Sequence, residues 1–211
     1  MKKNKILRLA SVMLMLCLIT TCAISGTFAK YTTNGTGSDT ARVAKWGVTV
    51  TVSGVSLFNT EYNSDKVVSS ETDVKVVAPG TSGTLADITI SGEPEVATTV
   101  TVAGTLTLTG FDAYCPIVFT VDGVTYGTND TTATNKSATV ADLKTAVEEA
   151  IAALSASFDA NETLDASALN SKISWAWVNN NANNVKDTVL GNQAANATAP
   201  SVTLALTVTV D

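Results

Sequence analysis

The sequence predicts an all-β protein, a jelly-roll-like β-sandwich with one inserted amphipathic α-helix. Threonine and valine, whose β-branched side chains favour extended backbone, are abundant. Apolar and polar residues alternate with a period of two in several short segments, and only one segment has helical spacing. About seven or eight strands separated by turn residues are typical of a sandwich.

Composition narrows the possible functions. The chain has 211 residues, of which 45% are apolar, and this suits one good-sized β-domain. The formal net charge of -6 disfavours nucleic acid as a partner, because an acidic surface repels phosphate. Histidine, the commonest general base and a common zinc ligand, is absent. We therefore predict a protein that is not an enzyme and that has no catalytic, cofactor-binding or metal-binding residues.

Residues 1–29 have the order of a secretory signal peptide. A positive stretch comes first, formed by Lys2, Lys3, Lys5 and Arg8. The apolar run 9–24 follows, and small residues lead to Ala29, so we expect cleavage between Ala29 and Lys30. The alternatives are an uncleaved membrane anchor and a lipoprotein signal at Cys22. The apolar run is shorter than the roughly 20 residues that a membrane span needs.

Cleavage at this position leaves one cysteine in the mature chain. That residue, Cys115, lies at the head of an apolar strand. With no partner it forms no internal disulfide, and with no histidine to activate it a nucleophilic role is disfavoured. We interpret Cys115 as a small buried hydrophobic residue.

The remainder divides into a short segment and a domain. Residues 30–43 carry two glycines and few apolar side chains, and we expect them to be extended. Residues 44–211 form the predicted β-sandwich domain. Its strands are expected at 44–53, 74–78, 85–90, 97–109, 117–126, 173–177 and 202–210.

Two turn signals and one change of period refine this pattern. Asp122-Gly123 predicts a type I′ hairpin within 117–126, and Gly104 predicts a bulge or bend within its strand. Segment 140–158 predicts the inserted helix, with Thr139 as its cap. Its apolar stripe consists of Leu143, Val147, Ile151, Leu154 and Phe158. We expect the asparagine-rich stretch 179–184 to be a loop.

Two groups of residues leave alternatives open. Trp46, Trp175 and Trp177 would form either part of the core or a platform on which sugars stack. Segment 159–170 starts like a calcium-binding EF-hand loop but lacks the required glycine and the final glutamate. A weak calcium contact or a solvated loop would fit that segment.

Several stretches resemble proteins of the TasA/camelysin family. Segments 26–32 and 41–48 are similar to the export signal and first strand of that family. Segments 173–177, 187–191 and 202–210 are similar to its C-terminal part. The resemblance implies processing by a SipW-type signal peptidase and a jelly-roll subunit of extracellular biofilm fibres. It also implies that the N-terminal segment of one subunit completes the sheet of the next.

On this basis we expect a secreted structural subunit of a bacterial cell-surface or biofilm matrix fibre. The subunit would assemble head-to-tail by strand donation, with itself as principal partner and minor fibre proteins as further partners. The candidate donor strand lies in residues 30–43, where Tyr31, Ala41 and Val43 are the apolar contributors. The alternatives are that this segment is a plain spacer, or that the protein is a monomeric surface adhesin or carbohydrate-binding module.

Overall fold

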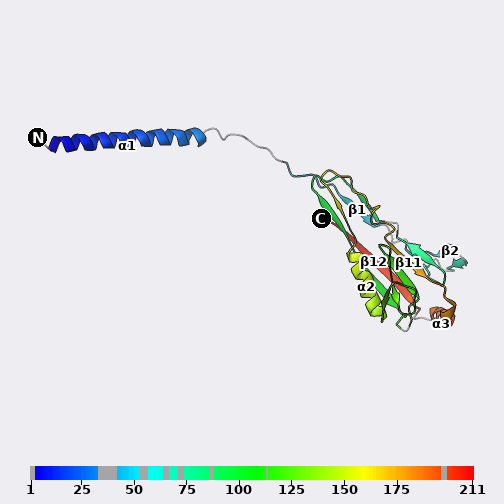
Figure 1. Ribbon diagram of the computed structural model, residues 1–211. Coiled ribbons are helices and arrows are strands. Elements are labelled where there is room, and N and C mark those ends of the chain that lie inside the picture. Colours follow the sequence, from blue (N-terminus) through cyan, green and yellow to red (C-terminus); the bar gives the residue numbers. More distant parts are fainter. Residues whose placement is uncertain are drawn as a thin grey trace. The chain divides into compact units, whose positions relative to one another are not determined.

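The computed structural model divides into two compact units, Met1–Val43 and Ala44–Asp211 (Figure 1). Each unit is described by itself. The structure describes residues 3–32, 42–52, 57–63, 67–70, 74–85, 88–112, 114–195 and 199–211.

The first unit is formed by one long helix, α1 (Lys3–Thr32). Its large apolar side chains between Ile6 and Ile19 are 58–77% exposed, so the helix has no core of its own over that stretch. The helix continues through Ala29 and Lys30 to Thr32, where we expected extended chain after residue 29. No proline interrupts residues 3–32, and the first strong helix-stopping signal, Asn34-Gly35, comes only afterwards.

The second unit is rich in β-structure, which confirms the broad fold prediction. One sheet has five strands, in the order β4 (Ser82–Thr84), β11 (Ile173–Trp177), β7 (Ile117–Val121), β8 (Val124–Thr128), β9 (Asn135–Ser137). Another has three, in the order β10 (Ser155–Phe158), β6 (Thr98–Thr109), β12 (Ser201–Val210). Two ribbons pair β1 (Thr49–Val52) with β5 (Ile88–Ser91), and β2 (Glu61–Asn63) with β3 (Val67–Ser69). The described pairs are antiparallel except β8–β9.

One apolar core is shared by the two larger sheets. Strand β6 buries alternate residues, as its period-two sequence predicts, and β11 does the same. Their inward side chains belong to one cluster together with those of β7, β12 and the second helix. Burial of these side chains is the main force that holds the sheets together.

The predicted hairpin is confirmed in type and register. Asp122 and Gly123 have φ angles of 47° and 79°, the left-handed values that a type I′ turn requires. Val121 therefore pairs with Val124. Two residues further from the turn, Phe119 pairs with Tyr126, also as predicted.

The inserted helix is confirmed but is shorter than predicted. Helix α2 (Val140–Ala152) begins with a capping box, in which Thr139 and Asp142 each bond the other's backbone. Leu143, Val147 and Ile151 are buried as expected. The prediction that the helix reaches residue 158 is wrong, because residues 155–158 pair with β6 as strand β10.

A further helix corrects the prediction of a single helix and of an asparagine-rich loop. The short 3-10 helix η1 (Asn181–Asn183) is capped by the side chain of Asn180. Helix α3 (Asn184–Ala194) continues from it and buries Asp187 and Leu190. Asparagine is a favourable helix cap, so this stretch starts a helix instead of forming only a loop.

Two smaller predictions are also corrected. The first predicted strand, 44–53, is reduced to β1, and Trp46 lies outside it with 43% of its surface exposed. Gly104 forms no bulge, because it pairs with Leu206 within an unbroken register. It provides space instead: a Cβ at this position would lie 2.9 Å from Cδ1 of Ile151.

Candidate functional site

Strand β12 forms one edge of its sheet and has no strand paired to its outer side among the described residues. The backbones of Thr99 and Asp211 exchange hydrogen bonds of 2.8 and 3.0 Å, and these set the alternation between β6 and β12. In an antiparallel ladder, successive residues direct their backbone groups to opposite sides. The even-numbered residues of β12 therefore point their N–H and C=O groups away from β6, at Val202, Leu204, Leu206, Val208 and Val210. Within the described ranges, no hydrogen bond engages these outward groups.

The opposite edge of the same sheet is covered. Strand β10 pairs with β6 only over residues 98–101. Beyond it, the N–H of Val102 donates to the carbonyl of Leu154 at 3.4 Å. The N–H of Leu106 donates to Oε1 of Glu148, on α2, at 2.7 Å. Unpaired strand edges can pair with other chains, so helix α2 protects this side of the sheet, whereas β12 has no strand paired to its outer side among the described residues.

An apolar groove of about 610 Å³ lies beside the first residues of β12. Its apolar lining consists of Phe58, Val74, Val76, Val77, Ala194, Ala199, Pro200, Val202 and Leu204. Ser70, Lys75, Ser201 and Thr203 add polar groups. A strand added to an edge gains backbone hydrogen bonds, and pockets beside the edge receive alternate side chains. The β12 edge and the groove provide both features.

A buried tryptophan fixes the position of Phe58 in the lining of the groove. Trp175, on β11, donates from its indole N–H to the carbonyl of Leu57 at 2.7 Å. The ring of Phe58 lies against it, with 5.2 Å between ring centroids. Gly83 makes room for this contact, since a Cβ there would lie 2.0 Å from the Leu57 oxygen. Burial of Trp175 thus places Phe58 beside the groove.

Strand β1 lies close to β12 without extending its sheet. Residues of the two strands are in contact, yet β1 pairs with β5 and β12 pairs with β6. In the described part of the chain, hydrogen-bonded pairing on this side therefore stops at β12. An additional strand would continue the sheet in the direction that β12 leaves open.

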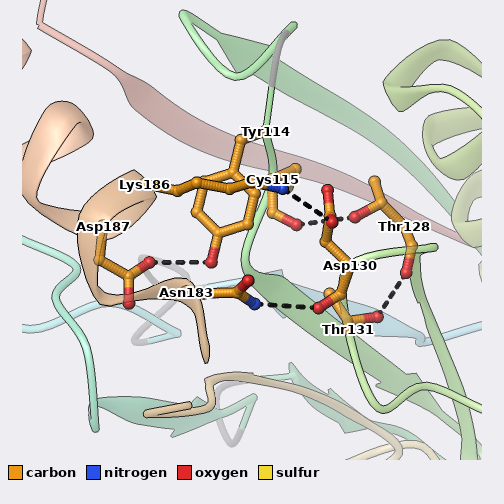
Figure 2. A network of polar contacts seen from close by, with 8 residues as sticks. All are labelled: Tyr114, Cys115, Thr128, Asp130, Thr131, Asn183, Lys186 and Asp187. Atoms are coloured by element: carbon orange, nitrogen blue, oxygen red, sulfur yellow. Dashed lines mark hydrogen bonds and ion pairs between the residues drawn. The ribbon is translucent and has the colours of Figure 1, made fainter. Parts of the chain in front are cut away.

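A polar network holds α3 in place (Figure 2). The last residue of this helix, Ala194, lines the groove. The hydroxyl of Tyr114 donates to Oδ1 of Asp187 at 2.9 Å, and the indole N–H of Trp177 donates to the same atom at 3.3 Å. Lys186 forms an ion pair with Asp130 at 2.9 Å. The amide of Asn183 donates to the backbone carbonyl of Asp130 at 3.1 Å. These contacts come from α3 and the segment before it, so they fix that end of the domain.

Two groups near this network, Tyr114 and Cys115, have raised pKa values, which favours their neutral forms. Burial, followed by the hydrogen bond to Asp187, raises the pKa of Tyr114. Burial raises the pKa of the Cys115 thiol to about 11. Cys115 is 0% exposed, which confirms the prediction that it is buried. A thiol with this pKa stays protonated near neutral pH and is a poor nucleophile.

Other features of the described residues add no second large site. Two cavities beside Tyr114 and Asp130 have volumes of about 10 and 80 Å³, smaller than pockets that hold organic ligands. No three His, Cys, Asp or Glu side chains gather as metal ligands in the part of the chain that the structure describes. Among those same residues, no helix has both the length and the apolar character of a membrane span.

No family model, curated protein or solved structure matches this chain. The geometry of its own residues is therefore the basis for interpreting the site.

The residues predicted for cleavage and donation belong to the first unit. Ala29, Lys30 and Tyr31 lie in the last turns of α1. Ala41 lies outside the described residues. Val43 is described and is 91% exposed, so it makes almost no contact.

The three tryptophans do not form a sugar platform. Trp175 and Trp177 are 1% and 5% exposed and point into the core from β11. Trp46 is the exposed member of the three. The core interpretation is thus confirmed for two of them.

Sequence reasoning missed Glu148 and Asp187. Glu148 follows buried Val147 and precedes Ile151 by three residues, so it flanks the buried stripe of α2. Asp187 precedes Leu190 by three residues and shares its face of α3. Acidic residues beside an apolar helical stripe were the available signal, but their hydrogen-bond donors are far away in sequence.

Proposed function

We propose that this chain is a secreted structural subunit of an extracellular fibre, at the surface or in the biofilm matrix of a bacterium. Subunits assemble head-to-tail by strand donation. The observation that carries the proposal is the unpaired outer edge of β12 beside an apolar groove. In this proposal the two larger sheets form a jelly-roll-like sandwich that accepts one strand from a neighbouring copy.

The donor is the segment at the start of the mature chain, residues 30–43. Tyr31, Ala41 and Val43 supply its apolar side chains, and two glycines allow close backbone approach. The side chain of Val43 is already exposed, so it loses few contacts within its own chain when it inserts into a neighbouring copy. The donor and the acceptor belong to one sequence, and a single type of subunit is therefore enough to build a fibre.

The free energy of strand donation depends on how much apolar surface is buried in the groove. A ladder to the outward N–H and C=O groups of β12 contributes about 1 kcal/mol for each hydrogen bond. Ordering the donor backbone costs about 1–2 kcal/mol per residue, which offsets that gain. Burial of apolar surface, at about 25 cal/mol per Å², must supply the surplus. The apolar lining of the groove is where such burial would take place.

The leader supports export before assembly. Its positive start and exposed apolar helix have the features that secretion machinery recognises. In the proposal, a SipW-type signal peptidase cuts between Ala29 and Lys30. Cleavage then gives the donor segment a free end, which it needs to enter a neighbouring sheet.

Negative-stain microscopy of the purified mature protein, residues 30–211, tests the proposal. We expect filaments whose length increases with protein concentration. Deleting residues 30–39 should abolish them. Particles that stay globular at high concentration would instead support a monomeric adhesin or carbohydrate-binding module, and filaments from the deleted protein would exclude this segment as the donor.

An edge variant tests the acceptor. Val202→Pro removes an outward N–H and leaves the ladder with β6 in place, because Val202 does not bond to β6. Val202→Thr is the matched control, since it keeps that N–H. We expect filaments from Val202→Thr and not from Val202→Pro. Equal assembly by both variants would overturn the role of this edge.

A further inference from the structure

The two ends of the β-rich unit differ in the residues that lie there. The entry pole is the end at which Ala44 enters the domain. There the N–H of Lys45 donates to Oε2 of Glu95 at 3.0 Å, and the N–H of Glu95 donates to the carbonyl of Lys45 at 2.9 Å. Glu95 shortly precedes β6, and Thr99 pairs with Asp211. The entry pole therefore includes the end of β12.

The groove pole lies at the other end of the same strands. Ser201, which lines the groove, pairs with Thr109. Ten residue steps separate Thr99 from Thr109, which is about 33 Å of strand. Helix α3 lies at this end and the C-terminus at the other (Figure 1). The entry pole, where Ala44 begins the domain, is thus about 30 Å from the groove of the same domain.

Exposed apolar side chains concentrate at these poles. Seven large ones are exposed among the described residues of the β-rich unit: Trp46, Val74, Val96, Val124, Val178, Val185 and Val189. Trp46 and Val96 follow the paired residues Lys45 and Glu95, so they form the entry patch. The groove patch consists of Val74, which lines the groove, Val178, which follows β11, and Val185 and Val189 of α3.

The side chains of the groove patch lie largely outside the core of the domain. Val185 and Val189 are four residues apart on α3 and are 79% and 51% exposed. The side chains of α3 that dock on the domain are Asp187 and Leu190. Exposed apolar side chains that group together on a surface are a feature of protein interaction sites.

We propose that copies of this chain dock pole to pole, with the entry patch of one against the groove patch of the next. The inference rests on the proposed function. The two patches differ, so the contact is heterologous; repeated without closing on itself, it gives a filament of uniform polarity. Docking places residue 43 of one copy at the mouth of the next copy's groove.

This arrangement fixes the direction of the donated strand. Its residue 43 end lies beside Ser201 of the acceptor, and its residue 30 end lies toward Val210. The donor therefore runs antiparallel to β12. A segment folded back on its own domain would have its residue 43 end beside Asp211 and would run parallel to β12. Direction thus distinguishes donation between copies from insertion within one copy.

Disulfide trapping in the mature Cys115→Ala protein tests the direction. Ala41→Cys is combined with Thr203→Cys, near the groove, or with Thr209→Cys, near the entry pole. Oxidised filaments of the first pair should give a ladder of covalent multimers, because neighbouring strands bring cysteines within bonding distance. The second pair should not cross-link. A cross-link within single chains of the second pair, or no cross-link in intact filaments of the first, would overturn the proposal.

Surface variants test the patches separately. Val185→Asp with Val189→Asp should raise the concentration needed for assembly about tenfold or more. Val124→Asp is the matched control, because Val124 is 41% exposed and belongs to neither patch. Unmodified protein that never forms filaments would refute the proposed function. Normal filaments from the double variant would refute only the pole contact.

Discussion

The carboxylate of Glu148 accepts a hydrogen bond from the backbone N–H of Leu106, with 2.7 Å between Oε1 and N. The two residues are 42 positions apart, and the bond joins helix α2 to the edge of β6. It satisfies a backbone group that β10 is too short to reach. Among the described residues, the sheet thus has one edge capped by its own helix and one edge, that of β12, without a paired strand.

Removing this carboxylate should destabilise the domain. Glu148→Ala leaves the Leu106 N–H without its acceptor, and we expect a loss of about 1–3 kcal/mol in the free energy of unfolding. Glu148→Gln keeps an acceptor oxygen and should lose less. Urea unfolding of both variants measures the difference. Equal stability of Glu148→Ala and the unchanged protein would show that the cap is unimportant.

The space beside Gly104 should be needed by Ile151. A Cβ at Gly104 would lie 2.9 Å from Cδ1 and 3.1 Å from Cγ2 of Ile151. Gly104→Ala should therefore cost about 1–3 kcal/mol by overpacking. Ile151→Val removes Cδ1, so the double variant should recover part of that loss. Thermal unfolding of the two single variants and the double variant tests the coupling, and strictly additive losses would contradict it.

Asp187 should control both the docking of α3 and the ionisation of Tyr114. Asp187→Ala leaves two buried donors without an acceptor and should cost about 2–4 kcal/mol in the free energy of unfolding. Asp187→Asn removes the charge that helps to raise the pKa of Tyr114, so Tyr114 should ionise at a lower pH in that variant. Tyrosinate absorbance during an alkaline titration reports this shift. An unchanged titration would show that Asp187 does not influence the pKa of Tyr114.

Cys115 should make the domain less stable at alkaline pH. Burial raises the pKa of its thiol from 9.0 to about 11, so the folded state holds a proton that the unfolded state has already lost. The stabilising effect is therefore complete below pH 9.0 and disappears as the pH rises to about 11. The full loss is about 3 kcal/mol. Cys115→Ala should lack this part of the decline when unfolding is measured across that interval, and identical pH profiles would refute the assignment.

Local sequence patterns were sufficient to predict elements whose tertiary contacts favour the same secondary structure. Strands β6 and β12 follow period-two alternation, and the Asp122-Gly123 hairpin follows from turn chemistry. The end of α2 could not be predicted in the same way. Leu154 and Phe158 continue the helical stripe, but residues 155–158 gain ladder bonds to β6 instead. Distant pairing overrode a local preference.

The sequence by itself determined abundant β-structure, an amphipathic helix and the absence of histidine, and it predicted a signal-like leader. Those features depend on residue type and spacing, which are local. Only the tertiary structure decided that Glu148 covers one sheet edge, that β12 leaves the other open and that a groove lies beside it. An edge is open or covered according to which distant segments pack next to it, and no local pattern of residues records that choice.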